Sequence, residues 1–159
     1  YRQDTRPCIG CNAEAWTDQT PPDLPDTREE VLSAQTSYQV VSMLEGVVKR
    51  GTGRQIQSLG KPLAGKTGTT NDNRDAWFVG FSPDLAVGVY VGYDDNRSLG
   101  SRETGGRVAA PIFKAFMKSA LDKAMPPPFR IPPAVSLVRI NAKTGKLAKP
   151  ADETVILEA

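Results

Sequence analysis

The sequence predicts an α+β fold in which helices flank an antiparallel sheet. Three observations support this class: an amphipathic helical pattern ending near residue 50, two adjacent strand patterns joined by a Ser-Pro-Asp turn, and a second helical pattern after them. Strands that follow one another through a short turn pair as a hairpin. With 159 residues, the chain can form one core but is too short for two full domains.

Residues 1–30 are polar, contain four prolines and lack apolar periodicity, which predicts an extended loop or linker. Cys8 and Cys11 lie in this stretch, in RPCIGCNAE. Two thiols are too few for a zinc site, and the neighbouring proline and glycine do not fit a thioredoxin-like motif. The favoured interpretation is a loop that a small disulfide can close in an oxidising compartment, with a redox or metal role as the alternative.

Residues 31–125 are expected to hold the main body of the fold, and its first helix ends at the glycines of KRGTGR. Ser33 or Thr36 can cap the start of this helix. The residues predicted to share its apolar face are Val40, Val41, Leu44, Val47 and Val48.

Three strands are expected next, at residues 62–70, 75–82 and 85–93. Alternation in the second strand predicts that Trp77 and Phe81 face the core. The third strand carries Val87, Val89, Val91 and Tyr93 on one face, and alanine, glycine and Tyr90 on the other.

A second helix is predicted over residues 109–123. Its apolar face would contain Ile112, Phe113, Phe116, Ala120 and Leu121. Residues 126–159 read as a proline-rich linker and a short β tail. In that tail Lys143, Thr144 and Gly145 are expected to form a surface turn.

Composition excludes several kinds of function. The chain has no histidine, so histidine general bases and histidine-ligated metal sites are ruled out. The net charge is +2 with both signs interspersed, which does not favour nucleic acid as a partner. No apolar run is long enough to cross a bilayer. We expect neither a metal nor a cofactor.

The segment LGKPLAGKTGTTNDNRDAW allows two interpretations. Gly60 to Thr67 satisfies the pattern of a nucleotide-binding phosphate loop. Such a loop requires a buried strand before it and a helix directly after it. Here a polar stretch precedes the pattern and GTTNDN follows it, so the nucleotide interpretation is the less favoured one.

The favoured interpretation is a Lys-Thr-Gly strand of a serine acyl-transfer enzyme. Lys66 would supply a fixed cation, and Thr67 and Thr69 would offer hydroxyl donors to a substrate carboxylate. Gly68 would leave room for an acylated serine. The main-chain amide of Thr69 could serve as an oxyanion donor.

The run LAGKTGTTNDNRDAWFVGFSPDLAVGVYVGYDD, with YQVVSMLEGVVKRGTG before it and GGRVAAPIFKAFM after it, resembles the C-terminal half of the transpeptidase domain of class A penicillin-binding proteins. The resemblance implies the serine β-lactamase and transpeptidase-like fold. It also implies binding of D-Ala-D-Ala stem peptides and β-lactams by Lys66, Thr67, Gly68 and Thr69, with Lys66 also catalytic. The family further implies a membrane-anchored parent with an upstream glycosyltransferase domain and an extracytoplasmic or periplasmic location.

The chain departs from this family in two of its three motifs. It contains no Ser-x-Asn, and its single Ser-x-x-Lys, Ser58 to Lys61, lies where Gly60 and Pro62 oppose a helix. We therefore expect a fragment that lacks the nucleophile, and either binds the upstream part of its own domain or self-associates. A related serine hydrolase or β-lactam sensor remains the alternative function.

Overall fold

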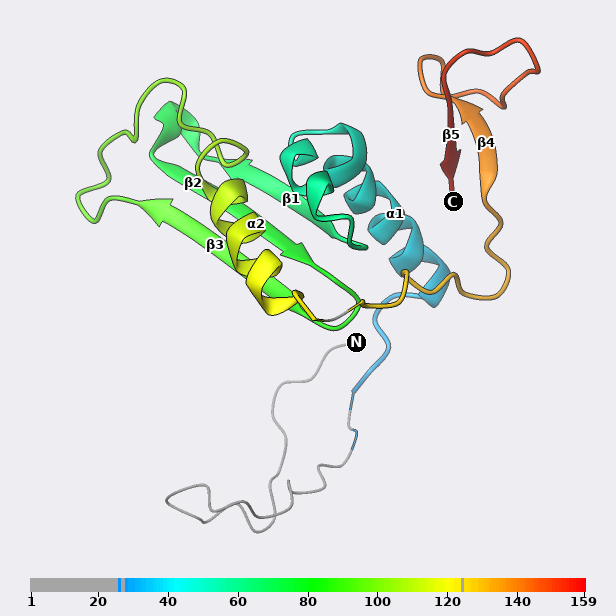
Figure 1. Cartoon of the computed structure of the whole chain (residues 1–159), viewed down its shortest axis with the longest axis horizontal. Coiled ribbons are helices and arrows are strands. Elements are labelled where there is room, and N and C mark those ends of the chain that lie inside the picture. The colour runs from blue at the N-terminus through cyan, green and yellow to red at the C-terminus, as the bar shows by residue number, and fades with distance from the viewer. Residues whose placement is uncertain (1–25, 27, 124) are drawn as a thin grey trace.

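The computed structural model describes residues 26, 28–123 and 125–159. Its centre is a three-stranded antiparallel sheet of β1 (Ala64–Thr69), β2 (Asp75–Phe81) and β3 (Ala86–Gly92), in that order. Helix α2 (Ala109–Ala120) crosses one face of the sheet, and helix α1 (Ala34–Arg50) lies along β1 (Figure 1). The predicted α+β class is confirmed. Cys8 and Cys11 lie outside the described residues.

Helix α1 begins after Ser33, whose Oγ accepts a hydrogen bond from the Thr36 amide at 3.2 Å. Ser33 is therefore the cap, rather than Thr36. The predicted apolar face is partly wrong, because Val48 is buried but Val40 is 41% exposed. Helix α1 packs against β1 and against the 3₁₀ helix η1 (Arg54–Leu59), and its buried residues are Tyr38, Gly46 and Val48.

The predicted core face of β2 is also wrong. Trp77 is 42% exposed and Phe81 is only half-buried, whereas Phe78 is completely buried. The reason is the position of α2, because the rings of Phe78 and Phe113 lie 4.8 Å apart between centroids. Gly80 makes room for this pair, since a Cβ there would lie 2.8 Å from Phe113 Cζ.

Helix α2 buries one narrow stripe. Its buried residues are Ala109, Ala110, Phe113 and Met117, and Leu121 is buried just beyond its end. Burial of Phe113 and Leu121 was predicted from the sequence, but Ile112 and Phe116 are about half exposed. Positions four residues apart face the sheet, and Ile112 and Phe116 lie outside this stripe.

Ser82 closes the hairpin between β2 and β3. Its amide donates to the Leu85 carbonyl at 2.8 Å, and its Oγ accepts from the Leu85 amide at 3.1 Å. The hairpin predicted from Ser82, Pro83 and Asp84 is confirmed. Val87 and Val89 share one face of β3, as predicted, and this face packs against the core.

The tail forms a separate two-stranded sheet, β4 (Val138–Asn141) and β5 (Val155–Glu158), which lies beyond α1 (Figure 1). Asn141 Oδ1 accepts from the amides of Lys143 and Thr144, which confirms the predicted surface turn. An ion pair between Arg50 and Glu158 joins this tail to α1. Within the described part of the chain, no helix is long and apolar enough to cross a membrane.

Candidate functional site

The Lys-Thr-Gly-Thr segment occupies the edge strand of the main sheet. In the pairing of β1 with β2, Lys66 lies opposite Val79 and Thr67 lies opposite Phe78. Residues that face each other across a ladder share one face of the sheet. Thr67 and Thr69 therefore lie on the face covered by α2, and Lys66 and Gly68 lie on the opposite face.

The outer edge of β1 presents main-chain groups that do not pair with β2. The amide of Thr70 donates to the Asp75 carbonyl at 3.1 Å, so these two residues form a hydrogen-bonded pair. Hydrogen-bonded and non-bonded pairs alternate in an antiparallel ladder. The main-chain groups of Thr67 and Thr69 consequently point away from β2, as an oxyanion donor or a peptide-binding edge requires.

No phosphate loop is formed. Lys66 and Thr67 lie inside a strand that continues to Thr69, and only the three-residue 3₁₀ turn η2 (Asn71–Asn73) follows. A phosphate loop needs a helix directly after its Lys-Thr pair, so that the first helical amides face the phosphates. The nucleotide interpretation is therefore wrong.

Thr67 and Thr69 line a groove of about 560 Å³. The other lining residues are Thr52, Gln55, Thr104, Gly106 and Arg107. The set combines four hydroxyls, an amide and a guanidinium, and none of the described residues that line the groove is acidic. Such a surface is suited to an anionic ligand that accepts hydrogen bonds.

The two threonine hydroxyls are already oriented by neighbours. Thr52 Oγ1 and Thr67 Oγ1 lie 2.8 Å apart, and either can donate. The Gly105 amide donates to Thr69 Oγ1 at 2.9 Å. Since a hydroxyl carries one proton, Thr69 keeps its own proton available for an acceptor on a ligand.

Two glycines hold the loop before α2 against the strand. A Cβ at Gly105 would clash with the carbonyl oxygens of Gly68 and Trp77. A Cβ at Gly106 would lie 2.9 Å from the Thr52 carbonyl oxygen, and the Gly106 carbonyl accepts a hydrogen bond from Gln55 Nε2. Only glycine allows this close approach of one backbone to another.

Lys66 does not line the groove. Its side chain is exposed, and Nζ donates to the neighbouring Thr67 carbonyl at 2.8 Å. Gly68 lies beside Trp77, where an added Cβ would come within 3.1 Å of the Trp77 Cβ. Of the four residues predicted for the site, the fold thus brings Thr67 and Thr69 together in the groove and directs Lys66 elsewhere.

Sequence reasoning missed the other five residues that line the groove: Thr52, Gln55, Thr104, Gly106 and Arg107. The sequence pattern of KRGTGR indicates only the end of a helix, and it assigns no role to the segment before α2. The available signal was the Gly105-Gly106 pair just before a helical pattern, because paired glycines can mark a close backbone approach.

Ser58 lies apart from the groove. It belongs to η1, and its Oγ donates to the Gln55 carbonyl at 3.1 Å. Together with Lys61 it lines a different cavity of about 210 Å³, to which none of residues 66–69 contributes. This geometry agrees with the interpretation that Ser58 and Lys61 are not a nucleophile motif.

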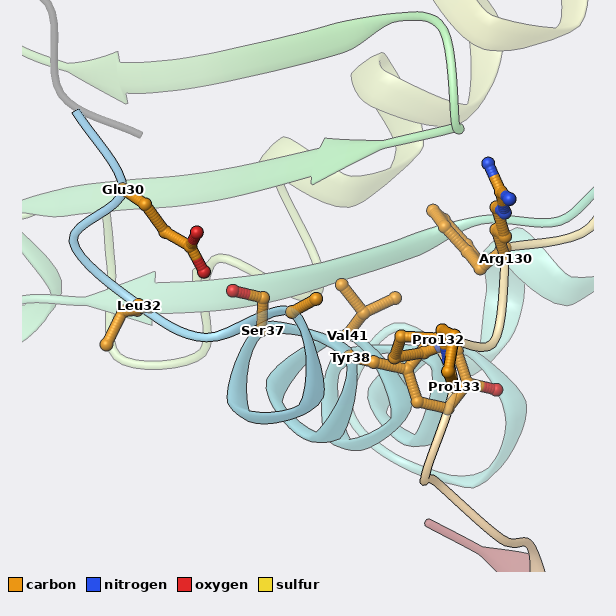
Figure 2. Close-up of a pocket in the computed structure, with 10 residues that line it drawn as sticks. Glu30, Leu32, Ser37, Tyr38, Val41, Arg130, Pro132 and Pro133 are labelled. Atoms are coloured by element: carbon orange, nitrogen blue, oxygen red, sulfur yellow. The ribbon is translucent and has the colours of Figure 1, made fainter. Parts of the chain in front are cut away.

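A further pocket, of about 510 Å³, lies between the start of α1 and the proline-rich segment (Figure 2). Tyr38, Val41, Phe129, Pro132 and Pro133 make it largely apolar. Burial raises the pKa of Tyr38, and the charge of Glu45 adds to the shift. None of residues 66–69 lines this pocket, and it holds no pairing of a nucleophile with a base among its described lining residues.

In the described part of the chain, the sheet face opposite α2 is exposed. We call this the bare sheet face, and its large exposed residues are Trp77, Val79 and Tyr90. The rings of Trp77 and Tyr90 lie 4.7 Å apart between centroids. Tyr90 donates to Asp75 Oδ1 at 2.9 Å, and Arg74 pairs with Asp72.

Comparisons with known proteins agree with this architecture. The family model described as "Penicillin binding protein transpeptidase domain" matches residues 6–118. The chain is 44% identical over 149 residues to penicillin-binding protein 1A of Rickettsia bellii, which covers 92% of this chain and 19% of that protein. It is also 44% identical over 127 residues to penicillin-binding protein 1A of Pseudomonas aeruginosa, covering 79% of this chain and 16% of that protein.

Among solved structures, the chain is similar to penicillin-binding protein 1A of Haemophilus influenzae. The TM-score is 0.70 at 31% identity, and the match covers 80% of this chain and 20% of that one. The chain therefore spans about a fifth of the length of the relatives it matches.

Proposed function

Since this chain belongs to the penicillin-binding protein transpeptidase domain family, we propose that its groove binds the terminal carboxylate of a peptidoglycan stem peptide ending in D-Ala-D-Ala. The observation that carries the proposal is the pair of threonine hydroxyls, Thr67 and Thr69, which line one groove without an acidic residue among its described neighbours. Hydrogen bonds to a carboxylate are among the strongest that neutral donors make.

The edge of β1 supports binding of an extended peptide. The main-chain groups of Thr67 and Thr69 point away from β2, so a ligand backbone can pair with them as an added strand. The amide of Thr69 would then donate to the oxyanion of the reacting carbonyl. Loss of one such donor costs about 3 kcal/mol of transition-state stabilisation.

Lys66 and Gly68 have different roles in this proposal. Lys66 lies on the other side of the strand from the groove, and its cation is the catalytic group that this chain contributes beside the reacting serine. Gly68 leaves space for the acylated form of that serine. A β-lactam, which carries a carboxylate next to a strained amide, would occupy the same groove and edge.

The reaction itself is proposed for a longer protein, a DD-transpeptidase that contains this chain. In that protein, residues 31–125 form the C-terminal portion of the transpeptidase domain, and residues 126–159 a linker and β tail. Other parts of the protein supply the Ser-x-x-Lys and Ser-x-Asn motifs, an upstream glycosyltransferase domain and a membrane anchor. The site then lies on the extracytoplasmic side of the membrane.

The bare sheet face fits this arrangement. Trp77, Val79 and Tyr90 expose 42%, 51% and 50% of their surface, which is unfavourable for aromatic and aliphatic side chains. We propose that the remainder of the transpeptidase domain packs on this face and brings its serine close to Lys66. In the isolated chain, self-association would cover the same surface.

The test is acylation of the longer protein by a penicillin. Replacing both Thr67 and Thr69 with valine should lower the second-order rate constant about 100- to 10,000-fold, because two hydrogen bonds to a charged group are lost and each is worth about 1.5 to 3 kcal/mol. Thr144→Val is the matched control, since Thr144 belongs to a second Lys-Thr-Gly that forms an exposed turn. An unchanged rate for the double variant, or an equal loss in the control, would contradict the proposal.

A further inference from the structure

We infer that Arg107 supplies the cation that binds the ligand's carboxylate, working together with Thr67 and Thr69. The inference rests on the proposed function of the groove and deepens it, because it assigns carboxylate charge recognition to a residue outside the Lys-Thr-Gly strand. Lys66, on the other side of that strand, keeps the catalytic role proposed above.

The first argument is location. Arg107 lines the groove with Thr67 and Thr69, whereas Lys66 does not. The ammonium of Lys66 is 2.8 Å from the Thr67 carbonyl. Hydroxyls alone offer neutral donors, and a planar guanidinium can hold a carboxylate with two parallel hydrogen bonds. Arg107 is thus the charged member of the donor set that lines this groove.

The second argument is availability. Four other arginines of the described residues have acidic partners, namely Arg28 with Asp26, Arg50 with Glu158, Arg74 with Asp72 and Arg97 with Asp95. In the described part of the chain, no ion pair or hydrogen bond occupies the guanidinium of Arg107, which is exposed in the groove. A ligand carboxylate would therefore not have to displace an existing partner.

The third argument is the way the backbone holds this arginine. The amides of Arg107 and Val108 donate to the Thr104 carbonyl at 2.9 and 2.8 Å. The amides of Ala109 and Ala110 donate to the Gly105 carbonyl at 3.1 and 2.9 Å. These main-chain donors are used within the loop and are not free to bind an anion, so the side chain of Arg107 is the charged donor that this loop offers.

Packing of the same loop fixes the distance between Arg107 and the strand. Gly105 donates to Thr69 Oγ1, and Gly106 lies against Thr52 too closely for any Cβ. The loop before α2 is thereby attached to Thr69 and Thr52, which both line the groove. An arginine one residue after this glycine pair is carried by a rigid support, which lowers the entropy lost on binding.

The test compares two ligands on the longer protein that contains this chain: a penicillin with a free carboxylate, and the methyl ester of the same penicillin. Arg107→Gln should lower the second-order acylation rate constant for the free acid about 10- to 100-fold, as for a lost charge-assisted hydrogen bond. The rate for the ester should stay within about threefold of the unmodified protein, since it has no charge to bind. Arg107→Lys should retain part of the preference for the acid.

Arg102→Gln is the matched control, because Arg102 is exposed on the same segment but does not line the groove. Thermal melting of each variant checks folding. Equal rates for Arg107→Gln and the unmodified protein on both ligands would overturn the inference, as would an equal loss on both.

The valine double variant at Thr67 and Thr69 distinguishes a failure of the role inferred for Arg107 from a failure of the function proposed for the groove. If it loses the preference for the free acid while Arg107→Gln keeps it, the groove binds the carboxylate without Arg107, and only the inference fails. If neither variant alters the preference, the proposed function of the groove fails as well.

Discussion

The main-chain amide of Gly105 donates a hydrogen bond to Thr69 Oγ1 at 2.9 Å, and so joins the loop before α2 to the end of β1. No side chain fits at Gly105, because an added Cβ would clash with the carbonyl oxygens of Gly68 and Trp77. Gly105→Ala should therefore displace the loop. We expect a loss of about 1 to 3 kcal/mol in the free energy of unfolding, as for other overpacked sites, measured by urea denaturation of this chain.

Gly88→Ala provides the control for that experiment. Gly88 lies inside β3, and a Cβ built there meets no atom within 4 Å. Its free energy of unfolding should change by no more than about 0.5 kcal/mol, the usual range for surface substitutions. Similar losses at Gly105 and Gly88 would show that the loop does not depend on close backbone contact.

Phe78 and Val79 are neighbours in β2 with opposite environments. Phe78 is fully buried against Phe113, whereas Val79 is 51% exposed on the bare sheet face. Phe78→Ala should cost about 3 to 5 kcal/mol of folding free energy through lost burial and a cavity. Val79→Ala should cost about 0.5 kcal/mol or less in this chain. Urea denaturation would contradict the assignment of faces if the two losses were equal.

The same pair of residues explains where sequence reasoning succeeded and where it failed. The period-2 pattern and the Ser82 turn gave the strands and their antiparallel pairing, because both signals are local. The choice of core face in β2 depends on which side α2 covers. Since Trp77, Phe78 and Val79 are all large and apolar, alternation alone could not make that choice.

The candidate site shows the same division. Thr67 and Thr69 could be identified because they belong to one short, contiguous motif, Lys-Thr-Gly-Thr. Thr52 and Arg107 lie 15 and more residues away in the sequence, and they reach the groove only because Gly105 and Gly106 pack directly on neighbouring backbone. A tertiary contact of this kind leaves no periodic signal in one sequence.

The isolated chain should not be labelled by a fluorescent penicillin. Acylation needs a nucleophile and a base beside the groove, and Ser58, with its hydroxyl bonded to the Gln55 carbonyl, lines a different cavity. The longer protein that contains the chain should be labelled under the same conditions. Gel fluorescence after denaturation reads out both results. Labelling of the isolated chain that disappears in Ser58→Ala would show that this serine does react.

Because of the hydrogen bond from Tyr90 to Asp75, the free energy of unfolding should decrease as pH rises in the alkaline range. This bond raises the pKa of Tyr90, with smaller contributions from burial and from the charges of Asp75 and Asp94. The folded state thus holds the phenolic proton more tightly than the unfolded state, in which the pKa is about 10. The stabilisation is complete below that pH and is lost as pH rises through the higher folded value.

Tyr90→Phe tests this dependence. Urea midpoints measured from pH 8 to above pH 10 should fall more steeply for the unmodified chain than for the variant, because only the former loses the Tyr90 proton on unfolding. Asp75→Asn should also make the fall of the urea midpoint with pH less steep, since a neutral amide no longer favours the protonated phenol. In an absorbance titration of phenolate formation, the difference between the unmodified chain and Tyr90→Phe gives the titration of Tyr90 itself. If that difference curve is centred at or below the ordinary tyrosine pKa, the bond to Asp75 does not hold the proton in solution.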